Sequence, residues 1–199
     1  SEPCVTAWID WVSKGLMGRT MQIDAQGWLS GGEYIPSPNC DDRPEGEIKL
    51  LVIHNISLPP NEFGGNGVQQ LFTNTLDANE HPYYATIAGF KVSAHFFVCR
   101  DGQITQFVSC LKRAWHAGES CWQGCIRCND FSIGIELEGT DTVPFTNAQY
   151  DALIALTRAI RAAYPINGIA GHSDIAPNRK TDPGPCFDWT RFLTALPQA

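Results

Sequence analysis

The sequence lacks the features that would tie the protein to a lipid bilayer or a polyanion. No apolar run approaches the roughly 18 residues that a membrane-spanning helix needs. Basic residues are in deficit, with 14 Lys and Arg against 21 Asp and Glu, and the formal net charge is −7. Nucleic acids and anionic membranes select a basic protein face. We therefore expect neither a nucleic acid nor a membrane as a partner.

Internal repeats, low-complexity linkers and a secretory signal are also missing. A length of 199 residues suits one domain. Asp10, Lys14 and Arg19 interrupt the N-terminal segment, where a signal peptide would have its apolar centre. We expect residues 1–20 to be a non-native or disordered extension, with a native N-terminal element as the alternative. Residues 21–199 are expected to form a single domain.

Cysteine is plentiful for this length, with eight copies. A domain of this size needs no disulfides to fold, and the spacing lacks the dense framework of small secreted domains. We expect reduced thiols in a cytoplasmic protein. Cys121, Cys125 and Cys128 have a spacing that could hold a structural zinc ion, but a fourth ligand would have to come from afar.

Hydrophobic patterning predicts an α/β fold. Residues 50–54 form an apolar run typical of a strand buried on both faces, and residues 131–138 alternate with period two. Asp101-Gly102 between two apolar arms predicts a hairpin within residues 94–108. Residues 146–164 have helical periodicity, and a short helix is expected to begin near residue 188. The fold class is α/β, with a mixed central β-sheet flanked by helices.

Only five histidines are present, so each can be considered separately. His54 ends the buried strand, which is where α/β sheets place their sites. His172 lies in a Gly-His-Ser-Asp segment, and Asp182 lies in a tight loop between prolines. Two imidazoles and one carboxylate are a suitable ligand set for catalytic zinc, although this spacing by itself is weak evidence.

Other polar residues could serve chemistry or simply face solvent. Glu136 and Glu138 project from one face of their strand, and the ordinary expectation is that both are solvated. Gly134 beside them would leave space for a ligand, which favours a function for one of the two. Lys180 could place a fixed positive charge near Asp182, but most loop lysines face solvent.

The remaining histidines favour structural roles. We expect His95 to be a hydrogen-bonded residue of the sheet and His81, which precedes a proline, to be structural. His116 follows Trp115 in a segment of aromatic and small residues. That segment would suit the wall of a sugar or peptide site, and a packed loop would look the same.

Several long blocks of sequence, in order, resemble the AmpD-type N-acetylmuramoyl-L-alanine amidases. The resemblance covers essentially everything from residue 21 onward. It is carried by Leu51–Pro60, Glu62–Gly65, Val92–His95, Arg113–Gly118, Cys128–Asp141, Gly171–Pro177 and Arg179–Pro185.

This resemblance implies the fold shared with phage amidases and peptidoglycan-recognition proteins, and it implies roles for particular residues. It assigns zinc to His54, His172 and Asp182, and catalytic roles to Glu136 and Lys180. Substrate contacts are expected from Asn55, Lys91, Trp115 and Arg127. Arg127 falls where the family has a basic residue near the peptide carboxylate, whereas Lys91 stands where relatives often have arginine. Lysine keeps the charge but loses the bidentate fork.

The expected function is zinc-dependent hydrolysis of the amide between 1,6-anhydro-N-acetylmuramic acid and L-alanine in cell-wall recycling. The substrate would be a small anhydro-muropeptide, the compartment the cytoplasm and the enzyme a monomer. One alternative is a peptidoglycan-recognition module that binds but does not catalyse. A second is a periplasmic amidase that acts on polymeric wall. A third gives the thiol cluster a separate redox or zinc role.

Overall fold

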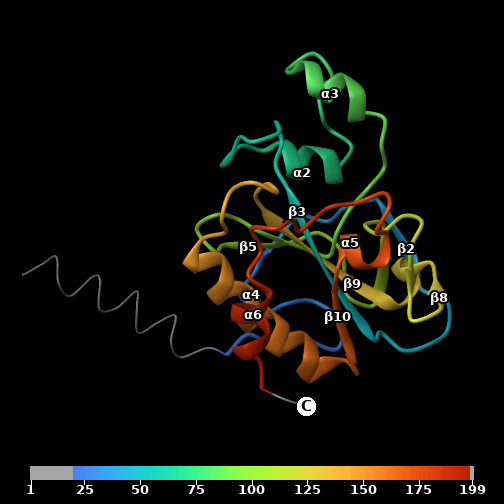
Figure 1. Cartoon of the computed structure of the whole chain (residues 1–199). Coiled ribbons are helices and arrows are strands. Elements are labelled where there is room, and N and C mark those ends of the chain that lie inside the picture. Colours follow the sequence, from blue (N-terminus) through green and yellow to red (C-terminus); the bar gives the residue numbers. More distant parts are fainter. Residues whose placement is uncertain (1–19, 198–199) are drawn as a thin grey trace, which may run out of the picture.

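A six-stranded mixed sheet forms the centre of the computed structural model, which describes residues 20–197 (Figure 1). The expected extension at residues 1–20 lies, apart from Thr20, outside the described residues. In spatial order the strands are β1 (Glu33–Tyr34), β5 (Ile104–Gln106), β4 (Phe96–Val98), β9 (Ser132–Glu138), β3 (Leu50–Ile56) and β10 (Gly168–Gly171).

Both parallel and antiparallel pairs occur in this sheet, which confirms the predicted mixed order. Strands β10, β3, β9 and β4 are mutually parallel, and β4 pairs with β5 as the expected antiparallel hairpin. Two short antiparallel pairs lie outside the sheet. They are β2 (Cys40–Asp42) with β6 (Lys112–Ala114), and β7 (Cys121–Trp122) with β8 (Cys125–Ile126).

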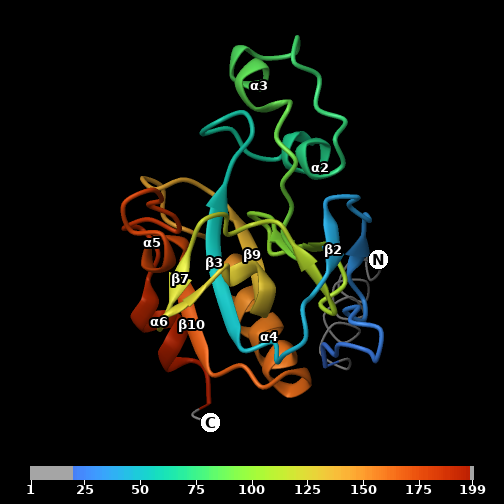
Figure 2. The ribbon, with the colours of Figure 1, turned by 90° about the vertical axis from the view of Figure 1, so that its right-hand side faces the viewer.

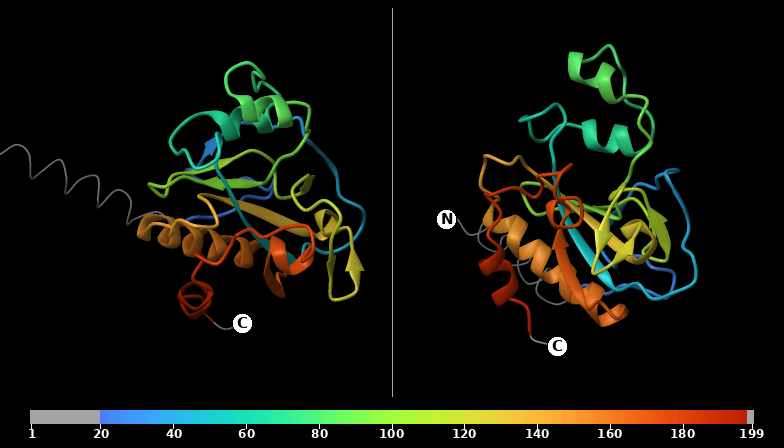
Figure 3. Two further views of the ribbon diagram at one scale, coloured as in Figure 1. Left: turned by 45° about the horizontal axis from the view of Figure 1, so that its top comes forward. Right: turned by 45° about the vertical axis from the view of Figure 1, so that its right-hand side comes forward.

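Helix α4 (Asn147–Ala163) covers one face of the sheet, with α6 (Trp189–Thr194) beside it (Figure 3). Thr146 caps α4, since its side chain accepts from the backbone N–H of Gln149, whose side chain accepts from the Thr146 N–H. Leu153 and Leu156 are fully buried in the core between the helix and the central strands. Both helices that the sequence predicts in residues 146–194 are therefore confirmed.

The opposite face of the sheet carries smaller elements. The 3-10 helix η1 (Cys128–Phe131), the β7–β8 hairpin and α5 (His172–Ile175) lie over it. A small core there joins Leu50 and Val52 of β3 to Ala117 and Ile175. No helix among residues 20–197 is both long enough and apolar enough to cross a membrane.

Residues 57–92 form an arm that extends beyond the carboxyl end of β3 (Figures 1 and 2). The arm contains α2 (Gly67–Phe72) and α3 (Pro82–Ile87). It has its own apolar core, in which Leu71, Phe72 and Tyr84 join Phe97 of β4 and Phe107. This packing fixes the arm beside the edge of the sheet where the strands β3 and β9 end.

Candidate active site

The register of the central strands brings the polar residues of the sheet together. His54 of β3 lies directly opposite Glu136 of the parallel strand β9. On the other side of β3, Gly171 of β10 pairs with Ile53, so that His172 follows one step later at the start of α5. Paired positions on parallel neighbours point to the same face. The sheet itself therefore places the two histidines and the glutamate in one row.

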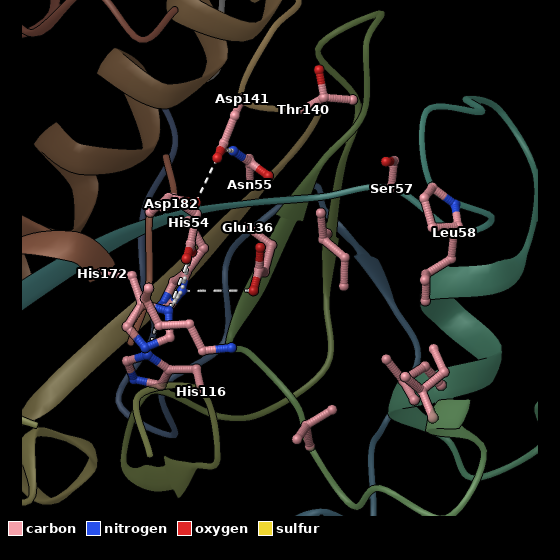
Figure 4. Close-up of a pocket in the computed structure, with 18 of the residues that line it drawn as sticks. His54, Asn55, Ser57, Leu58, His116, Glu136, Thr140, Asp141, His172 and Asp182 are labelled. Carbon is pink, nitrogen blue, oxygen red and sulfur yellow. Dashed lines mark hydrogen bonds and ion pairs between the residues drawn. The ribbon is translucent and has the colours of Figure 1, made fainter. Parts of the chain in front are cut away.

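Asp182 completes a compact group with the two histidines (Figure 4). His54 Nδ1 lies 3.0 Å from His172 Nδ1 and 3.0 Å from Asp182 Oδ2, and His172 Nδ1 lies 3.2 Å from that oxygen. In a tetrahedral site with bonds of about 2.0–2.1 Å, neighbouring ligand atoms lie about 3.3 Å apart. Within residues 20–197 this trio is the one group of metal-ligating side chains whose donor atoms converge.

Hydrogen bonding leaves His172 Nδ1 as a lone pair that faces the other two donor atoms. His172 Nε2 donates to the carbonyl oxygen of Ala117 at 2.9 Å, so the neutral ring has a bare Nδ1. Burial lowers the pKa of His54, with the neighbouring Asp182 carboxylate acting in the opposite direction. Neutral imidazole nitrogen and carboxylate oxygen are established metal ligands. The donor set therefore fits a bound metal ion.

Glu136 is buried beside this group without a full set of partners. Its Oε1 lies 3.8 Å from His54 Nδ1, and its buried Oε2 has no hydrogen-bond partner among the described residues. Burial and then the Asp182 carboxylate raise the pKa of Glu136 well above its usual value, and Lys180 acts against them. A carboxyl group with a raised pKa and a free oxygen is suited to exchange protons with a ligand.

The expectation that both strand glutamates are solvated is wrong. Glu138 is 6% exposed. Its two carboxylate oxygens accept from the backbone N–H groups of Gly64, in the arm, and Arg100, at distances of 2.8 and 2.9 Å. Arg100 also donates to the Glu138 backbone carbonyl and lies over the Phe63 ring. Glu138 thus anchors the base of the arm, and the neighbouring Glu136 is left for the site.

The space beside Gly134 is also filled, which corrects the expectation that a ligand would use it. A Cβ at this position would lie 2.5 Å from Cγ of His116. His116 lines the site cavity, as the sequence allowed, and it also contacts His54, because its Nδ1 lies 2.8 Å from His54 Nε2. Burial, followed by the nearby His54, lowers the pKa of His116 well below its usual value. The sequence carried one signal for this contact, a glycine in the middle of a buried strand.

The other two histidines have structural partners. His95 Nδ1 accepts from the Gly134 N–H at 3.1 Å, and its Nε2 lies 2.9 Å from the Lys112 carbonyl oxygen. Its pKa is lowered to about 3 by burial and by the Arg43 guanidinium. His81 caps α3 by accepting from the Tyr83 N–H at 3.0 Å. Both residues have the structural contacts that the sequence suggested.

A cavity of about 650 Å³ opens from the His54 group toward the arm. Of the residues assigned to substrate, Asn55 and Trp115 line it, and Lys180 lies on its wall. Asn55 Nδ2 donates to Asp141 Oδ1 at 2.7 Å, and Figure 4 shows these two side chains next to each other. Asn55 Nδ2 also donates to the Pro183 carbonyl oxygen at 3.0 Å. The arm contributes apolar side chains to the far end of the cavity, namely Leu58, Leu71, Phe72, Tyr83, Ile87 and Phe90.

Lys91 and Arg127 are not among the residues that line this cavity. The Arg127 side chain is 71% exposed, and its Nε lies 3.5 Å from Asp130. The backbone of Arg127 is in the left-handed region, with φ of 54°. Their proposed contacts with substrate stay predictions that depend on how the substrate extends from the cavity.

The thiols of the β7–β8 region do not form a second metal group among the described residues. All seven described cysteines are free thiols. Cys121 is exposed, Cys125 accepts from Lys49 Nζ at 3.7 Å, and Cys128 is buried. Burial raises the pKa of Cys128, which disfavours the thiolate that a metal would need.

Comparison with known proteins shows which proteins this chain is similar to. The AmpD protein of Escherichia coli (strain K12), a 1,6-anhydro-N-acetylmuramyl-L-alanine amidase, is 59% identical over 170 residues, which are 84% of this chain and 93% of that protein. A crystal structure of a selenomethionine derivative of AmpD superposes with a TM-score of 0.87 at 57% identity, covering 89% of this chain and 100% of the other.

A more distant structure is also similar. It is the E. coli amidase AmiD in complex with the substrate anhydro-N-acetylmuramic acid-L-Ala-D-gamma-Glu-L-Lys, with a TM-score of 0.55 at 32% identity. The match covers 88% of this chain and 65% of AmiD. Residues 44–185 match the family model described as N-acetylmuramoyl-L-alanine amidase, a range that contains every member of the His54 group and Glu136. The chain is therefore an enzyme of the N-acetylmuramoyl-L-alanine amidase family.

Proposed function

We propose that the protein is a zinc-dependent amidase that cleaves the bond between 1,6-anhydro-N-acetylmuramic acid and L-alanine in small muropeptides. The observation that carries this proposal is the convergence of His54, His172 and Asp182 beside the unpartnered Glu136. Two neutral imidazoles and one carboxylate match the ligand set of catalytic zinc sites, which keep one position open. The relatives named for this reaction supply the substrate class.

Zinc, when bound by these three residues, supplies a Lewis acid for the amide carbonyl and lowers the pKa of water. Glu136 has a buried oxygen free to take the proton of the attacking water, and it can return that proton to the alanine nitrogen. Lys180 adds a positive charge on the wall of the cavity, where negative charge develops on the carbonyl oxygen.

The inner end of the cavity is polar, and Asn55 and Trp115 lie on the cavity wall. We assign both to substrate contact, and we keep Lys91 and Arg127 as contacts for a peptide that extends beyond the cavity. We expect the enzyme to be a monomer. We expect it to act in the cytoplasm, where it would recycle imported wall fragments.

The test is peptide release from 1,6-anhydro-muramoyl-tripeptide, followed by mass spectrometry. We expect the free tripeptide and the free anhydro sugar, loss of release after chelation, and recovery when zinc is added back. Folded, zinc-loaded protein that binds the substrate without cleaving it would contradict the amidase proposal. That result would favour a peptidoglycan-recognition module instead.

A further inference from the structure

Three buried side chains, His54, His116 and Ser132, are linked in a row by hydrogen-bond contacts that begin at the second ring nitrogen of His54. His54 Nε2 lies 2.8 Å from His116 Nδ1, and His116 Nε2 lies 3.0 Å from Ser132 Oγ. The exposed fractions of the three residues are 1%, 9% and 0%. None of the roles proposed above uses His116 or Ser132.

His172 ends differently, and the difference is chemical. Its Nε2 meets the Ala117 carbonyl oxygen, which can only accept a hydrogen bond. The proton of His172 is therefore held on Nε2 whatever lies at Nδ1. In the His54 chain every member can both donate and accept, because imidazole and hydroxyl groups have both capacities.

Two arrangements of protons satisfy the chain. Without a metal ion, a proton on His54 Nδ1 donates to Asp182 Oδ2 at 3.0 Å, since two lone pairs would otherwise face each other. His54 Nε2 then accepts from His116 Nδ1–H, and His116 Nε2 accepts from the Ser132 hydroxyl. With a metal ion on Nδ1, His54 must carry its proton on Nε2, and both contacts reverse their direction.

We propose that His116 and Ser132 are positioning residues that allow His54 to exchange one tautomer for the other when the metal ion binds. This inference rests on the proposed metal centre. Each arrangement has three protons on the three side chains. The metal ion displaces the proton of His54 Nδ1 to water, the protons of His116 and Ser132 each move one step toward His54, and Ser132 takes up one proton from water, so the chain has no net gain or loss. A ligating histidine normally has its other nitrogen held by such a partner. A fixed acceptor at this place would favour the bound tautomer alone.

Gly134 shows that the fold reserves room for this partner. A side chain at position 134 would lie 2.5 Å from the His116 ring, and the strand is fully buried there. His116 is also held by its backbone N–H, which donates to Asn129 Oδ1 at 3.1 Å. The ring therefore packs closely against Gly134 beside His54, and the backbone that carries the ring is held by Asn129.

Nitrogen chemical shifts of the histidine rings would test the exchange directly. In protein labelled with ¹⁵N-histidine, we expect His54 and His116 to carry their protons on Nδ1 without metal and on Nε2 with zinc. His172 is an internal reference, since it should stay protonated on Nε2 in both states. A His116 ring with the same tautomer in both states would overturn the proposal.

Zinc affinity of variants gives an independent readout. His116→Phe should weaken zinc binding by about 10–100-fold, and Ser132→Ala by less. His116→Asn should recover part of the affinity, because its amide can either accept from or donate to His54 Nε2. Thr157→Val is the matched control, since it removes a buried hydroxyl that donates to the Leu153 carbonyl on the other face of the sheet.

The outcomes separate this inference from the proposed function. Folded His116→Phe protein that binds zinc as tightly as the wild type would overturn the role of His116. Equal losses of affinity in Thr157→Val and Ser132→Ala would overturn the role of Ser132 and indicate general destabilisation. Wild-type protein that binds no zinc would instead refute the metal centre on which the inference rests.

Discussion

The carboxyl edge of the central sheet and the β7–β8 hairpin both concentrate metal-ligating residue types, and both lie on the same side of the sheet. At the sheet edge, His54 and the start of α5 are fixed by the pairing of β3 with β9 and β10. In the hairpin, Cys121 and Cys125 lie on two short paired strands, where Cys121 is exposed and Cys125 is half-buried. Donor atoms converge where β3, α5 and the loop of Asp182 meet. Close spacing of three cysteines within one short segment does not bring their sulfur atoms together as a metal group.

Loss of a ligand from the sheet edge should have the largest effect. His54→Ala removes one of three converging donors and should abolish zinc retention and amidase activity together. The triple change of Cys121, Cys125 and Cys128 to serine should leave both unchanged. Metal analysis of dialysed protein and peptide release measure the two properties. Zinc lost from the serine variant would make the hairpin a metal site and remove the contrast.

The two glutamates of β9 allow a second comparison, between a proposed catalytic residue and a structural residue of the same sheet edge. Glu136→Gln removes the group proposed to move protons, so kcat should fall by about 10²–10⁴-fold while zinc is retained. Glu138→Gln weakens two hydrogen bonds from backbone N–H groups. It should cost about 1–3 kcal/mol of unfolding free energy and leave kcat within a few-fold.

Activity assays and denaturant titrations on both variants test this division. A large fall in kcat for well-folded Glu138→Gln would mean that the base of the arm takes part in the reaction. Unchanged kcat in Glu136→Gln would remove the proposed proton acceptor from the mechanism.

Two glycines provide a matched pair of smaller changes, one in each region. Gly134→Ala would place a methyl group against the His116 ring and should cost about 1–3 kcal/mol. Gly124→Ala meets no neighbouring atom within 4 Å, but its φ of 80° should cost about 1–2 kcal/mol. Thermal unfolding should therefore show similar losses, whereas zinc titration should show weaker binding only for Gly134→Ala. Equal zinc affinities would argue that His116 does not support His54.

Local signals explain which parts of the structure the sequence predicted. The Thr146 and Gln149 capping box, the Asp101-Gly102 turn and the apolar run of β3 each act over a few residues, and each corresponds to an element of the structure. The resemblance to known amidases, more than spacing, selected His54, His172 and Asp182. His54 and His172 are 118 residues apart, and the pairing of β3 with β10 brings them together. Asp182 reaches them from a loop, where its backbone carbonyl accepts from the Ser173 N–H at 2.9 Å.

The contacts that the sequence missed depend on packing between distant segments. Alternation placed Glu136 and Glu138 on one face, but it could not show that the arm returns over Glu138 through Gly64. Likewise, nothing local connects Gly134 to the His116 ring that fills its space. Buried polar partners of this kind become visible only when both chain segments are in place.

Cys125→Ser should produce the smallest effect, and it examines the hairpin alone. Cys125 Sγ accepts from Lys49 Nζ at 3.7 Å, and Lys49 also lies 5.0 Å from the centre of the Phe131 ring. A serine hydroxyl can still accept from the ammonium group, so the change in unfolding free energy should stay within about 0.5 kcal/mol. For a chain of this length that corresponds to a shift in Tm of about 1–2 °C. A larger fall in Tm that disappears when zinc is removed from both proteins would show that the hairpin contributes to metal binding, and the two regions would then have to be treated as one site.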